Sequence, residues 1–562
     1  MALQTLRPDA LADWVLRARY AAPGERDPDD VRQRVARALA EAEEPRHRAG
    51  WRRRFLAAMR SGFIPAGRIL ASAGREIGST WANCFVQPLA EIPDDAGILR
   101  PTLGQALTET VRTLRAGGGV GVNLSPLADP VAALHAFNDA CAQATGHSAR
   151  PGALMGLMDV DHPRIEDFIE AKRDGGLTHF NLSVVISDAF MQRIEQREPA
   201  AQGLWDRLAL SAWSCGEPGV VFIDTVRRDD ALAASETIVA VNPCGEQPLP
   251  AYGSCCLGSI DLTRFVRRGL TRSARIDDIA LAHTVQTAVR LLDNAIDLSP
   301  WPLPAQAAQA RRTRRIGLGL TGLADALMLL GVRYGSADGR RAAVAVLQTL
   351  RQAAFAASVD LARERGCFPA FDAPTYLAPP GHASRLPAAL RAAIRRHGLR
   401  NSHLLSLAPA GGISLAMAGG VSSGIEPVWG WQIERLLHTA NHAEVRLTHV
   451  DPVWRRWCER HRRVNGPRPS PARPSAFETV EDIAPSAQLA MVAALAPWVD
   501  GGISKTLRLP PTSTPHHVSK LLQQAWRRRV KGLTVYRSEP GRAGPVDTTP
   551  GAAGSQPRRL AS

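Results

Sequence analysis

Residues 241–262 read VNPCGEQPLPAYGSCCLGSIDL, and this stretch holds three of the eight cysteines of the chain. Cys244 stands between a proline and a glycine, so we expect it on a constrained loop rather than inside a helix or strand. Asn242 and Glu246 each lie two residues from it. An amide, a thiol and a carboxylate on one tight loop form a compact set for acid–base chemistry. A packed cysteine in a turn explains these few residues equally well.

The composition is that of a large soluble protein. The chain has 562 residues, a formal net charge of +15 and 45% hydrophobic residues, which suits about three or four domains or one large α/β barrel. It has no run of eighteen apolar residues, and its N-terminus is typical of an amphipathic helix rather than a signal peptide. We therefore expect a cytoplasmic protein with no membrane segment.

The charge comes mostly from arginine and fits either a solvated surface or anionic ligands such as nucleotides or nucleic acid. Only 5% of the residues are aromatic, so few side chains are available to stack on nucleic-acid bases. The cysteines form no CxxC pair and no zinc-finger spacing, so we expect no structural zinc site. In a reducing compartment they are either packed thiols or redox partners distant in sequence.

The first eighty residues have a helical pattern, whereas short apolar strands alternate with helical stretches from Asn83 onward. FNLSVVIS (180–187) and VVFIDTV (220–226) are such strands, and the alternation predicts an α/β fold with parallel or mixed pairing. The glycine-rich AGGGVGVNLS (116–125) matches neither GxGxxG nor a P-loop, so we expect a tight turn there.

The opening stretch resembles the radical loop of ribonucleotide reductases, in which NPCGEQ is followed by a proline-containing segment and then GxCNLGSINL. Further motifs resemble the same family in the same order, over roughly residues 10–537. They are FIPAGRILASAG (63–74), NCFVQPL (83–89), GGGVGVNLS (117–125), RRIGLGLTGLADALMLLG (314–331), RNSHLLSLAP (400–409), SSGIEP (422–427), ISKT (503–506) and KGLTVYR (531–537).

This resemblance implies a fold. It predicts an N-terminal helical region over residues 1–80 and a ten-stranded α/β barrel of the ribonucleotide reductase/glycyl-radical type over residues 81–537. A finger loop around Cys244 would lie at the centre of the barrel. The Gly-, Pro- and Ser-rich residues 538–562 are predicted to be a disordered tail.

The resemblance also assigns catalytic roles. Cys244 would carry the thiyl radical that abstracts the 3′ hydrogen of the ribose, Glu246 would take the 3′-hydroxyl proton, and Asn242 would hydrogen-bond the ribose. Cys84 and Cys255 would be the dithiol that reduces the 2′ carbon and closes to a disulfide, which supplies the two electrons that the reaction needs. We expect the other cysteines to be packed thiols.

Three radical sources exist in the family, and the sequence favours adenosylcobalamin. The oxygen-dependent class uses two adjacent tyrosines, but Val535 precedes Tyr536 here. The glycyl-radical class needs a C-terminal glycine loop that this sequence does not show. The motif sequences are most similar to those of the cobalamin-dependent class. The cobalt of this class is held within the cofactor, so we expect no metal site formed by protein ligands.

Substrate and effector sites follow from the same resemblance. The family's phosphate loop APTGTIS reads APAGGIS at 408–414, with Ala410 and Gly412 in place of threonines. Glu91 and Arg150 are the expected effector contacts. The predicted substrate-binding residues are Asn83, Gly118, Ala408, Pro409, Ala410, Gly411, Gly412, Ile413 and Ser414.

The expected partners are ribonucleoside diphosphate substrates, deoxynucleoside triphosphate effectors, a thioredoxin-like or small-thiol reductant, and a second copy in a homodimer. No nucleic-acid or membrane partner is expected. Two other hypotheses stay open at this point. The altered phosphate loop is compatible with a non-catalytic or impaired nucleotide-binding relative, and the arginine content alone is compatible with a nucleic-acid-binding protein.

Overall fold

The computed structural model describes residues 10–89, 102–145, 152–173, 175–438, 444–465 and 473–537. The chain begins with helices α1 (Ala10–Arg19), α2 (Pro28–Ala40) and α3 (Pro45–Ser61). Helix α2 starts at a capping box, because the Asp27 carboxylate accepts hydrogen bonds from the backbone of Asp29 and Asp30. The apolar face of α2 is fully buried, as expected from its spacing. The predicted tail at 538–562 lies outside the described residues.

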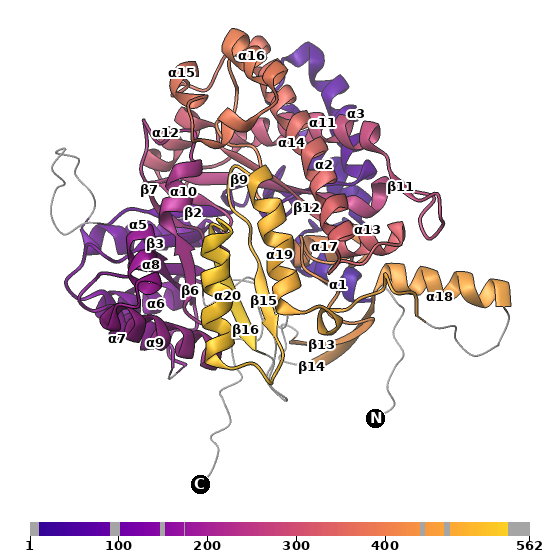
Figure 1. Ribbon diagram of the computed structural model, residues 1–562. Helices are drawn as coiled ribbons and strands as arrows, with labels where there is room; N and C mark the ends of the chain where they lie inside the picture. The colour runs from indigo at the N-terminus through magenta and orange to yellow at the C-terminus, as the bar shows by residue number, and fades with distance from the viewer. Residues whose placement is uncertain are drawn as a thin grey trace.

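Five strands form the first half of the central sheet and pair in parallel in chain order. Helices connect them, so each connection is a βαβ unit that returns the chain to the same end of the sheet (Figure 1). The strands are β2 (Cys84–Gln87), β3 (Gly119–Asn123), β4 (Leu154–Asp159), β5 (Phe180–Ile186) and β6 (Gly219–Phe222). The helices are α5 (Leu103–Arg115), α6 (Pro130–Thr145), α7 (Ile165–Glu170), α8 (Asp188–Glu195) and α9 (Pro199–Cys215).

The second half is also parallel. Strand β9 (Ser254–Asp261) pairs with β12 (Ile316–Thr321), and β15 (Thr506–Leu509) pairs with β16 (Gly532–Arg537). Residues 403–407 join these two pairs through parallel bridges from Leu405 to Leu318 and from Leu407 to Ile503. Since Ile503 lies only three residues before β15, the hydrogen bonds continue from β12 to β15.

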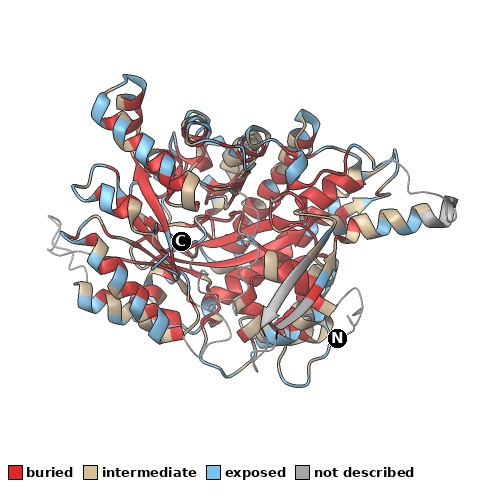
Figure 2. Cartoon of the chain, turned by 90° about the horizontal axis from the view of Figure 1, so that it is seen from below, coloured by how far each residue is buried: buried red, intermediate tan, exposed pale blue. Residues whose placement is uncertain are grey.

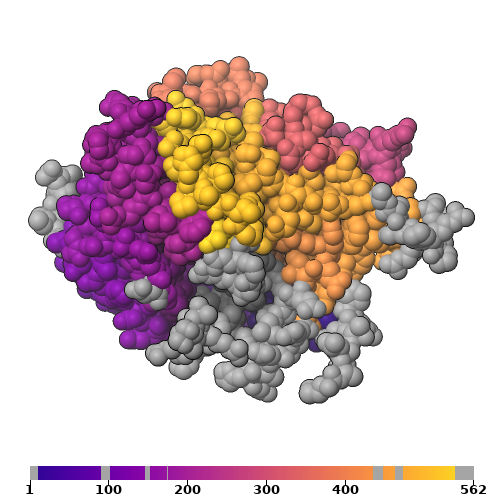
Figure 3. Space-filling model, turned by 60° about the horizontal axis from the view of Figure 1, so that its bottom comes forward, coloured from indigo at the N-terminus to yellow at the C-terminus, as the bar shows by residue number. Residues whose placement is uncertain are grey.

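The two halves meet in antiparallel fashion at both edges. Strand β2 runs antiparallel to β9, and β6 runs antiparallel to β16. Figure 3 shows the second junction at the surface, where the C-terminal segment, in yellow, lies against the first half, in purple. Backbone hydrogen bonds and isolated bridges therefore connect these strands in the order that the predicted barrel requires. Strand β1 (Phe63–Pro65) adds to β9 outside this set of strands.

Helices cover the outside of the barrel, with buried strands inside and exposed helix faces outside (Figure 2). Helix α14 (Ala337–Arg365) is apolar and long enough to cross a membrane, but 61% of its apolar window is buried. It packs as a core helix against α11 (Asp278–Leu298), α16 (Ala388–His397) and α19 (Pro485–Leu495). The outer helices are α4 (Gly67–Ser72), α10 (Ile223–Asp229), α11 (Asp278–Leu298), α12 (Pro304–Thr313), α13 (Leu323–Leu330), α14 (Ala337–Arg365), α15 (Ala373–Tyr376), α16 (Ala388–His397), α17 (Gly411–Ala418), α19 (Pro485–Leu495) and α20 (Pro515–Arg527).

Two small hairpins and one projecting helix complete the described fold. Strands β10 (Val266–Arg267) and β11 (Arg275–Ile276) pair antiparallel, as do β13 (Gln432–His438) and β14 (Glu444–Val450). Helix α18 (Pro452–Asn465) follows β14 and extends away from the barrel (Figure 1). Stacked tryptophans fix its base, where Trp454 lies between Trp431 and Trp457 at ring-centroid distances of 5.0 and 5.1 Å.

A third hairpin, β7 (Ile238–Val241) and β8 (Pro248–Pro250), runs through the barrel and contacts β2, β3 and β4. A Cβ added at Gly121 would lie 1.8 Å from the Val241 carbonyl oxygen, and one added at Gly119 would lie 3.0 Å from the Pro243 ring. The glycine-rich segment therefore begins with the expected turn at residues 116–117, where Gly117 has a φ of 92°, and continues as strand β3. Its glycines are needed because the hairpin passes against the strand.

We expect Gly121→Val to displace the hairpin, because its Cβ cannot coexist with the Val241 carbonyl at 1.8 Å. Overpacking of this kind lowers the free energy of unfolding by about 3 kcal/mol, which urea denaturation would measure. Gly104→Ala is the matched control, since Gly104 is exposed on α5 and has no atom within 4 Å of an added Cβ. Equal stability of the Gly121→Val variant and the wild type would contradict the close approach.

Candidate active site

The tip of the β7–β8 hairpin is a tight loop that carries the NPCGEQ motif. Asn242 N–H donates to the Gln247 carbonyl at 3.1 Å, and Gly245 N–H donates to the Asn242 carbonyl at 2.9 Å. Gly245 has a φ of 79°, in the left-handed region that favours glycine. The Pro-Cys-Gly sequence therefore suits this turn, and it places Cys244 at the tip.

The two predicted redox cysteines lie on neighbouring strands. Cys84 begins β2 and is directly opposite Cys255 of β9 where the two barrel halves meet. Their exposed fractions are 4% and 1%, and both are free thiols. Directly opposite residues of antiparallel strands have Cβ atoms about 4.5–5.5 Å apart. A small movement therefore brings these thiols within the range of a disulfide.

Three of the predicted catalytic side chains share one hydrogen-bond network. Asn242 Nδ2 donates to Glu246 Oε1 at 2.9 Å and to the Cys84 sulfur at 3.0 Å. The Cys84 thiol lies 3.6 Å from the same carboxylate oxygen. Glu246 Oε2 is buried and accepts no hydrogen bond from the described residues. This oxygen is therefore available to accept a hydrogen bond from a substrate hydroxyl.

Burial shifts the proton equilibria of this network. It raises the pKa of the Glu246 carboxyl, against the hydrogen bond from Asn242. Burial also raises the pKa of the Cys84 thiol well above its usual value, and Glu246, Cys255 and Cys244 add to the effect. Burial also raises the pKa of the Cys255 thiol, and the positive charge of Arg315 opposes this shift. Both thiols of the pair are therefore neutral and carry protons at neutral pH.

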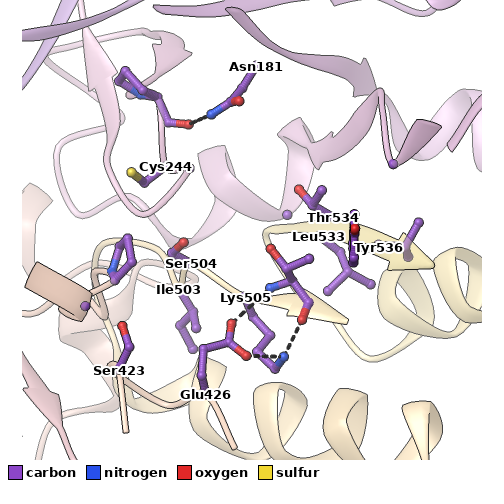
Figure 4. A pocket seen from close by; sticks show the side chains of 18 of the residues that line it. Asn181, Cys244, Ser423, Glu426, Ile503, Ser504, Lys505, Leu533, Thr534 and Tyr536 are labelled. Carbon is purple, nitrogen blue, oxygen red and sulfur yellow. Dashed lines mark hydrogen bonds and ion pairs between the residues drawn. The ribbon is translucent and has the colours of Figure 1, made fainter. Parts of the chain in front are cut away.

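Cys244 faces the other side of the loop, toward a cavity of about 680 Å³. Its side chain is exposed, and Figure 4 shows it at the cavity wall. Asn181 Nδ2 of β5 donates to the Pro243 carbonyl at 2.8 Å and so holds the tip in place. Further residues that line the cavity include Ser423, Glu426, Ile503, Ser504, Lys505, Leu533, Thr534 and Tyr536.

Part of the predicted phosphate loop also lines this cavity. Pro409, Gly411 and Gly412 do so, at the start of α17. The first N–H groups of a helix have no partner within it, which makes this end suited to an anion. The loop and Cys244 therefore face one common space, as the resemblance implies.

Other predicted substrate residues are placed away from the cavity wall. Ser414 is buried, and its hydroxyl lies 2.7 Å from that of Thr321. Ala410 is also buried, and its N–H donates to Ser423 Oγ at 2.9 Å. A Cβ added at Gly118 would lie 2.6 Å from the Phe85 ring, so this glycine serves strand–helix packing. Ala408 and Ile413 are likewise not among the cavity-lining residues.

Asn83 lies beside the redox pair, where its N–H donates to the Cys255 carbonyl at 3.3 Å. Its side-chain oxygen is buried and has no hydrogen-bond partner among the described residues, which suits a substrate contact. Glu91 and Arg150, the predicted effector contacts, lie outside the described residues.

Sequence comparisons agree with this geometry. The chain matches the ribonucleotide reductase barrel domain over residues 82–202 and 196–536 and the ribonucleotide reductase all-alpha domain over residues 6–78. The chain belongs to the ribonucleotide reductase family. The family resemblance read from the motifs is thereby confirmed.

Several relatives are named vitamin B12-dependent reductases. The chain is 35% identical to the vitamin B12-dependent ribonucleoside-diphosphate reductase of Mycobacterium tuberculosis (strain CDC 1551 / Oshkosh), over 95% of this chain and 80% of that protein. It is 29% identical to the enzyme of the same name from Thermoplasma acidophilum, over 85% of this chain and 64% of that protein. The vitamin B12-dependent ribonucleotide reductase of Streptomyces coelicolor is 25% identical over 75% of this chain and 53% of that protein.

The structure adds residues that the sequence interpretation did not assign. Gln247 N–H donates to Asn242 Oδ1 at 2.9 Å, and Gln247 Nε2 donates to Ser406 Oγ at 2.7 Å, which fixes the loop to the second barrel half. Lys505 is fully buried at the side chain and pairs with Glu426 at 2.6 Å in the cavity wall. Gln247 lies within the NPCGEQ motif itself, so the motif was a sufficient signal for it. The Lys505–Glu426 pair joins two separate motifs and needed the fold.

A cluster of Asp230, Glu236 and His403 lies behind Cys255, with ligand atoms within 4.8 Å of one another. The guanidinium of Arg315 hydrogen-bonds Glu236 and lies 3.5 Å from His403 Nε2. Arg315 precedes Ile316, whose register partner is Cys256, so Arg315 lies opposite Cys255 on the neighbouring strand. Arg315 therefore supplies the positive charge in this cluster, and the carboxylates compensate that charge inside the protein.

We expect the raised pKa of Glu246 to give Glu246→Gln a stability advantage that depends on pH. A carboxyl whose pKa is raised by folding stabilises the folded state at pH values below its pKa in the unfolded chain. This stabilisation is lost as the pH rises through the pKa of the carboxyl in the folded protein. The gain in melting temperature over the wild type should therefore be larger at pH 7 than at pH 4. Thermal unfolding across this range tests it, and a gain that grows toward acid pH would contradict the raised pKa.

Proposed function

We propose that the protein reduces ribonucleoside diphosphates to 2′-deoxyribonucleoside diphosphates by a thiyl-radical mechanism that starts with adenosylcobalamin. The observation that supports the proposal is that five side chains, three from one loop and two from the strands beside it, lie close to one another inside a barrel. Cys84, Asn242, Glu246 and Cys255 form its buried side, and Cys244 forms its cavity side. The product is a precursor for DNA synthesis and repair.

The cavity side of the loop is where adenosylcobalamin would meet Cys244. The exposed Cys244 thiol opens onto a space of about 680 Å³, and the apolar wall of Ile503, Leu533 and Val535 would hold the group there. When bound, the cofactor supplies homolysis of its cobalt–carbon bond, which generates a radical. The alternative supply through two adjacent tyrosines is not available at Tyr536, because its neighbour in β16 is Val535.

The thiyl radical on Cys244 takes the hydrogen atom from C3′ of the ribose. Glu246 then accepts the 3′-hydroxyl proton at Oε2, the oxygen that the described residues leave without a hydrogen bond. Asn242 holds the other oxygen of this carboxylate and so fixes its direction. Removal of this proton favours departure of the neighbouring 2′-hydroxyl.

Cys84 and Cys255 complete the reduction. Their neutral thiols protonate the leaving 2′-hydroxyl, the C2′–O bond breaks and water departs. The pair transfers two electrons and a hydrogen to the sugar and closes to a disulfide. Cys244 returns its hydrogen atom to C3′, which regenerates the thiyl radical, and the proton held by Glu246 returns to the 3′ oxygen. An external dithiol then reduces the disulfide for the next turnover.

Nucleotide substrates and a reductant follow from the family. The finer predictions, namely deoxynucleoside triphosphate effectors at Glu91 and Arg150, a thioredoxin-like or small-thiol reductant, a homodimer and a cytoplasmic location, are part of this proposal. The hypothesis of a non-catalytic relative is not favoured, because the full set of catalytic side chains is present and assembled. The nucleic-acid hypothesis rests on charge alone.

We expect the purified chain to reduce CDP or ADP anaerobically with adenosylcobalamin and dithiothreitol and without a second subunit. Cys244→Ser should lower turnover to the background rate, because a hydroxyl cannot replace the thiol as hydrogen-atom carrier. Cys367→Ser is the matched control, since Cys367 is an exposed cysteine elsewhere in the chain. Turnover that persists in Cys244→Ser, or a wild type that reduces neither nucleotide, would refute the proposal.

A single turnover without dithiothreitol should convert two thiols of the wild type to a disulfide. Thiol titration after denaturation should then count two fewer thiols than before the reaction. Cys255→Ser should show no such loss, because Cys84 has no other partner directly opposite it. Loss of two thiols in that variant would exclude Cys255 from the pair.

A further inference from the structure

The N-terminal helix α1 forms part of the wall of the cavity that contains Cys244. Leu11, Val15 and Arg19 of α1 line this cavity together with Gly411 and Gly412 of the phosphate loop. Helix α1 packs against α17, whose first turn carries that loop. The helical region is thus part of the substrate space and not only a support for the barrel.

The helical region is fastened to the other end of α17 as well. Arg32 of α2 donates from Nη2 to the Met417 carbonyl at 3.0 Å. Arg34 of the same helix donates to the Tyr20 carbonyl at 3.0 Å and so fixes the end of α1. These contacts hold the segment that contains Arg19 and Tyr20 in a defined position against α17.

Gly412 shows how closely α1 approaches the loop. A Cβ added at this glycine would lie 2.6 Å from the Tyr20 hydroxyl oxygen and 3.4 Å from Arg19 Nη1. The space of a side chain at position 412 is therefore occupied by a hydroxyl and a guanidinium from α1. Gly412 lies in the first turn of α17, so its backbone would accept other residues if that space were open.

The chemistry of these two groups matches what the loop has lost. The family motif has threonines where this chain has Ala410 and Gly412, so two hydroxyl donors are absent from the loop itself. Tyr20 places a hydroxyl at one of these positions, and Arg19 adds a positive charge with several donors. A guanidinium binds phosphate oxygens in pairs, with charge-assisted hydrogen bonds that are stronger than those of a neutral hydroxyl.

We propose that Arg19 and Tyr20 bind the diphosphate of the substrate and replace the hydroxyls missing from positions 410 and 412. The inference rests on the proposed function for its ligand, a nucleoside diphosphate. The phosphate groups lie between the first turn of α17 and the end of α1, with Arg19 against their charge. The site favours diphosphates over unphosphorylated nucleosides through α1 as well as through the loop.

Equilibrium dialysis of CDP and of cytidine against the full chain tests this without turnover. Loss of a charged hydrogen bond corresponds to about a tenfold change in Kd, so Arg19→Gln should weaken CDP binding by about that factor and leave cytidine binding unchanged. Tyr20→Phe should weaken CDP binding to a smaller degree. Arg17→Gln is the matched control, because Arg17 is an exposed arginine of the same helix.

A reciprocal exchange separates a specific role from damage to the fold. Gly412→Thr alone should weaken CDP binding, because the new side chain meets the Tyr20 hydroxyl. Tyr20→Ala should also weaken it. The double variant Tyr20→Ala with Gly412→Thr restores a hydroxyl in the open space and should bind CDP more tightly than either single variant. Melting temperatures of all variants show whether the helical region stays folded.

The outcomes distinguish this inference from the proposed function. A wild type that binds CDP through Arg19 but does not reduce it would refute the function and keep the phosphate site. A wild type that reduces CDP with equal KM in Arg19→Gln would refute the phosphate site and keep the function. Equal losses of CDP and cytidine binding in Arg19→Gln, failure of the double variant to recover, or no CDP binding by the wild type would each overturn the inference.

Discussion

The antiparallel junction between β2 and β9 is the constraint on which the site depends. Within each half of the barrel the strands run parallel, and parallel neighbours are joined by long crossover connections. At the junction the chain directions oppose each other, and the first residue of β2, Cys84, meets Cys255 near the start of β9. The same pairing closes the barrel on one side, so the fold and the redox pair have a common origin.

Burial at this junction sets the protonation state of the site. In water, a carboxyl is ionised at neutral pH, and a thiol beside it loses its proton only at higher pH. Inside the barrel the raised pKa values of Cys84 and Cys255 keep hydrogens on both thiols, and the pKa of Glu246 is raised as well. Asn242 opposes the shifts of Glu246 and Cys84, because it donates hydrogen bonds to both the carboxylate and the sulfur. Cys244 itself is exposed at the cavity wall.

The motifs made the family and the barrel domain predictable, and they also predict the main catalytic residues, because thiol, carboxylate and amide types carry the chemistry directly. Other features depended on contacts that periodicity and spacing do not encode. The glycines of β3 match no nucleotide-binding pattern, and their reason is a hairpin that arrives from residues 238–250. Ser414 looked like a phosphate ligand from its place in the loop, yet its hydroxyl lies against Thr321 inside the protein. The end of α1 matches no motif, and only its close approach to Gly412 in the structure points to a role in binding.

The anchoring of the finger hairpin has a consequence for how the molecule is made. Gly502 N–H donates to the Glu246 carbonyl at 2.7 Å, and β16 supplies the last backbone contacts of the barrel wall. A ribosome therefore releases the finger segment after β2–β5 but long before Ser406 and Gly502, which also hold it. Contacts between such distant parts of a chain form late in folding. A nascent chain thus has its cysteines in place along the backbone but no enclosed space around them, and the enclosed site arises only when synthesis of the barrel is complete.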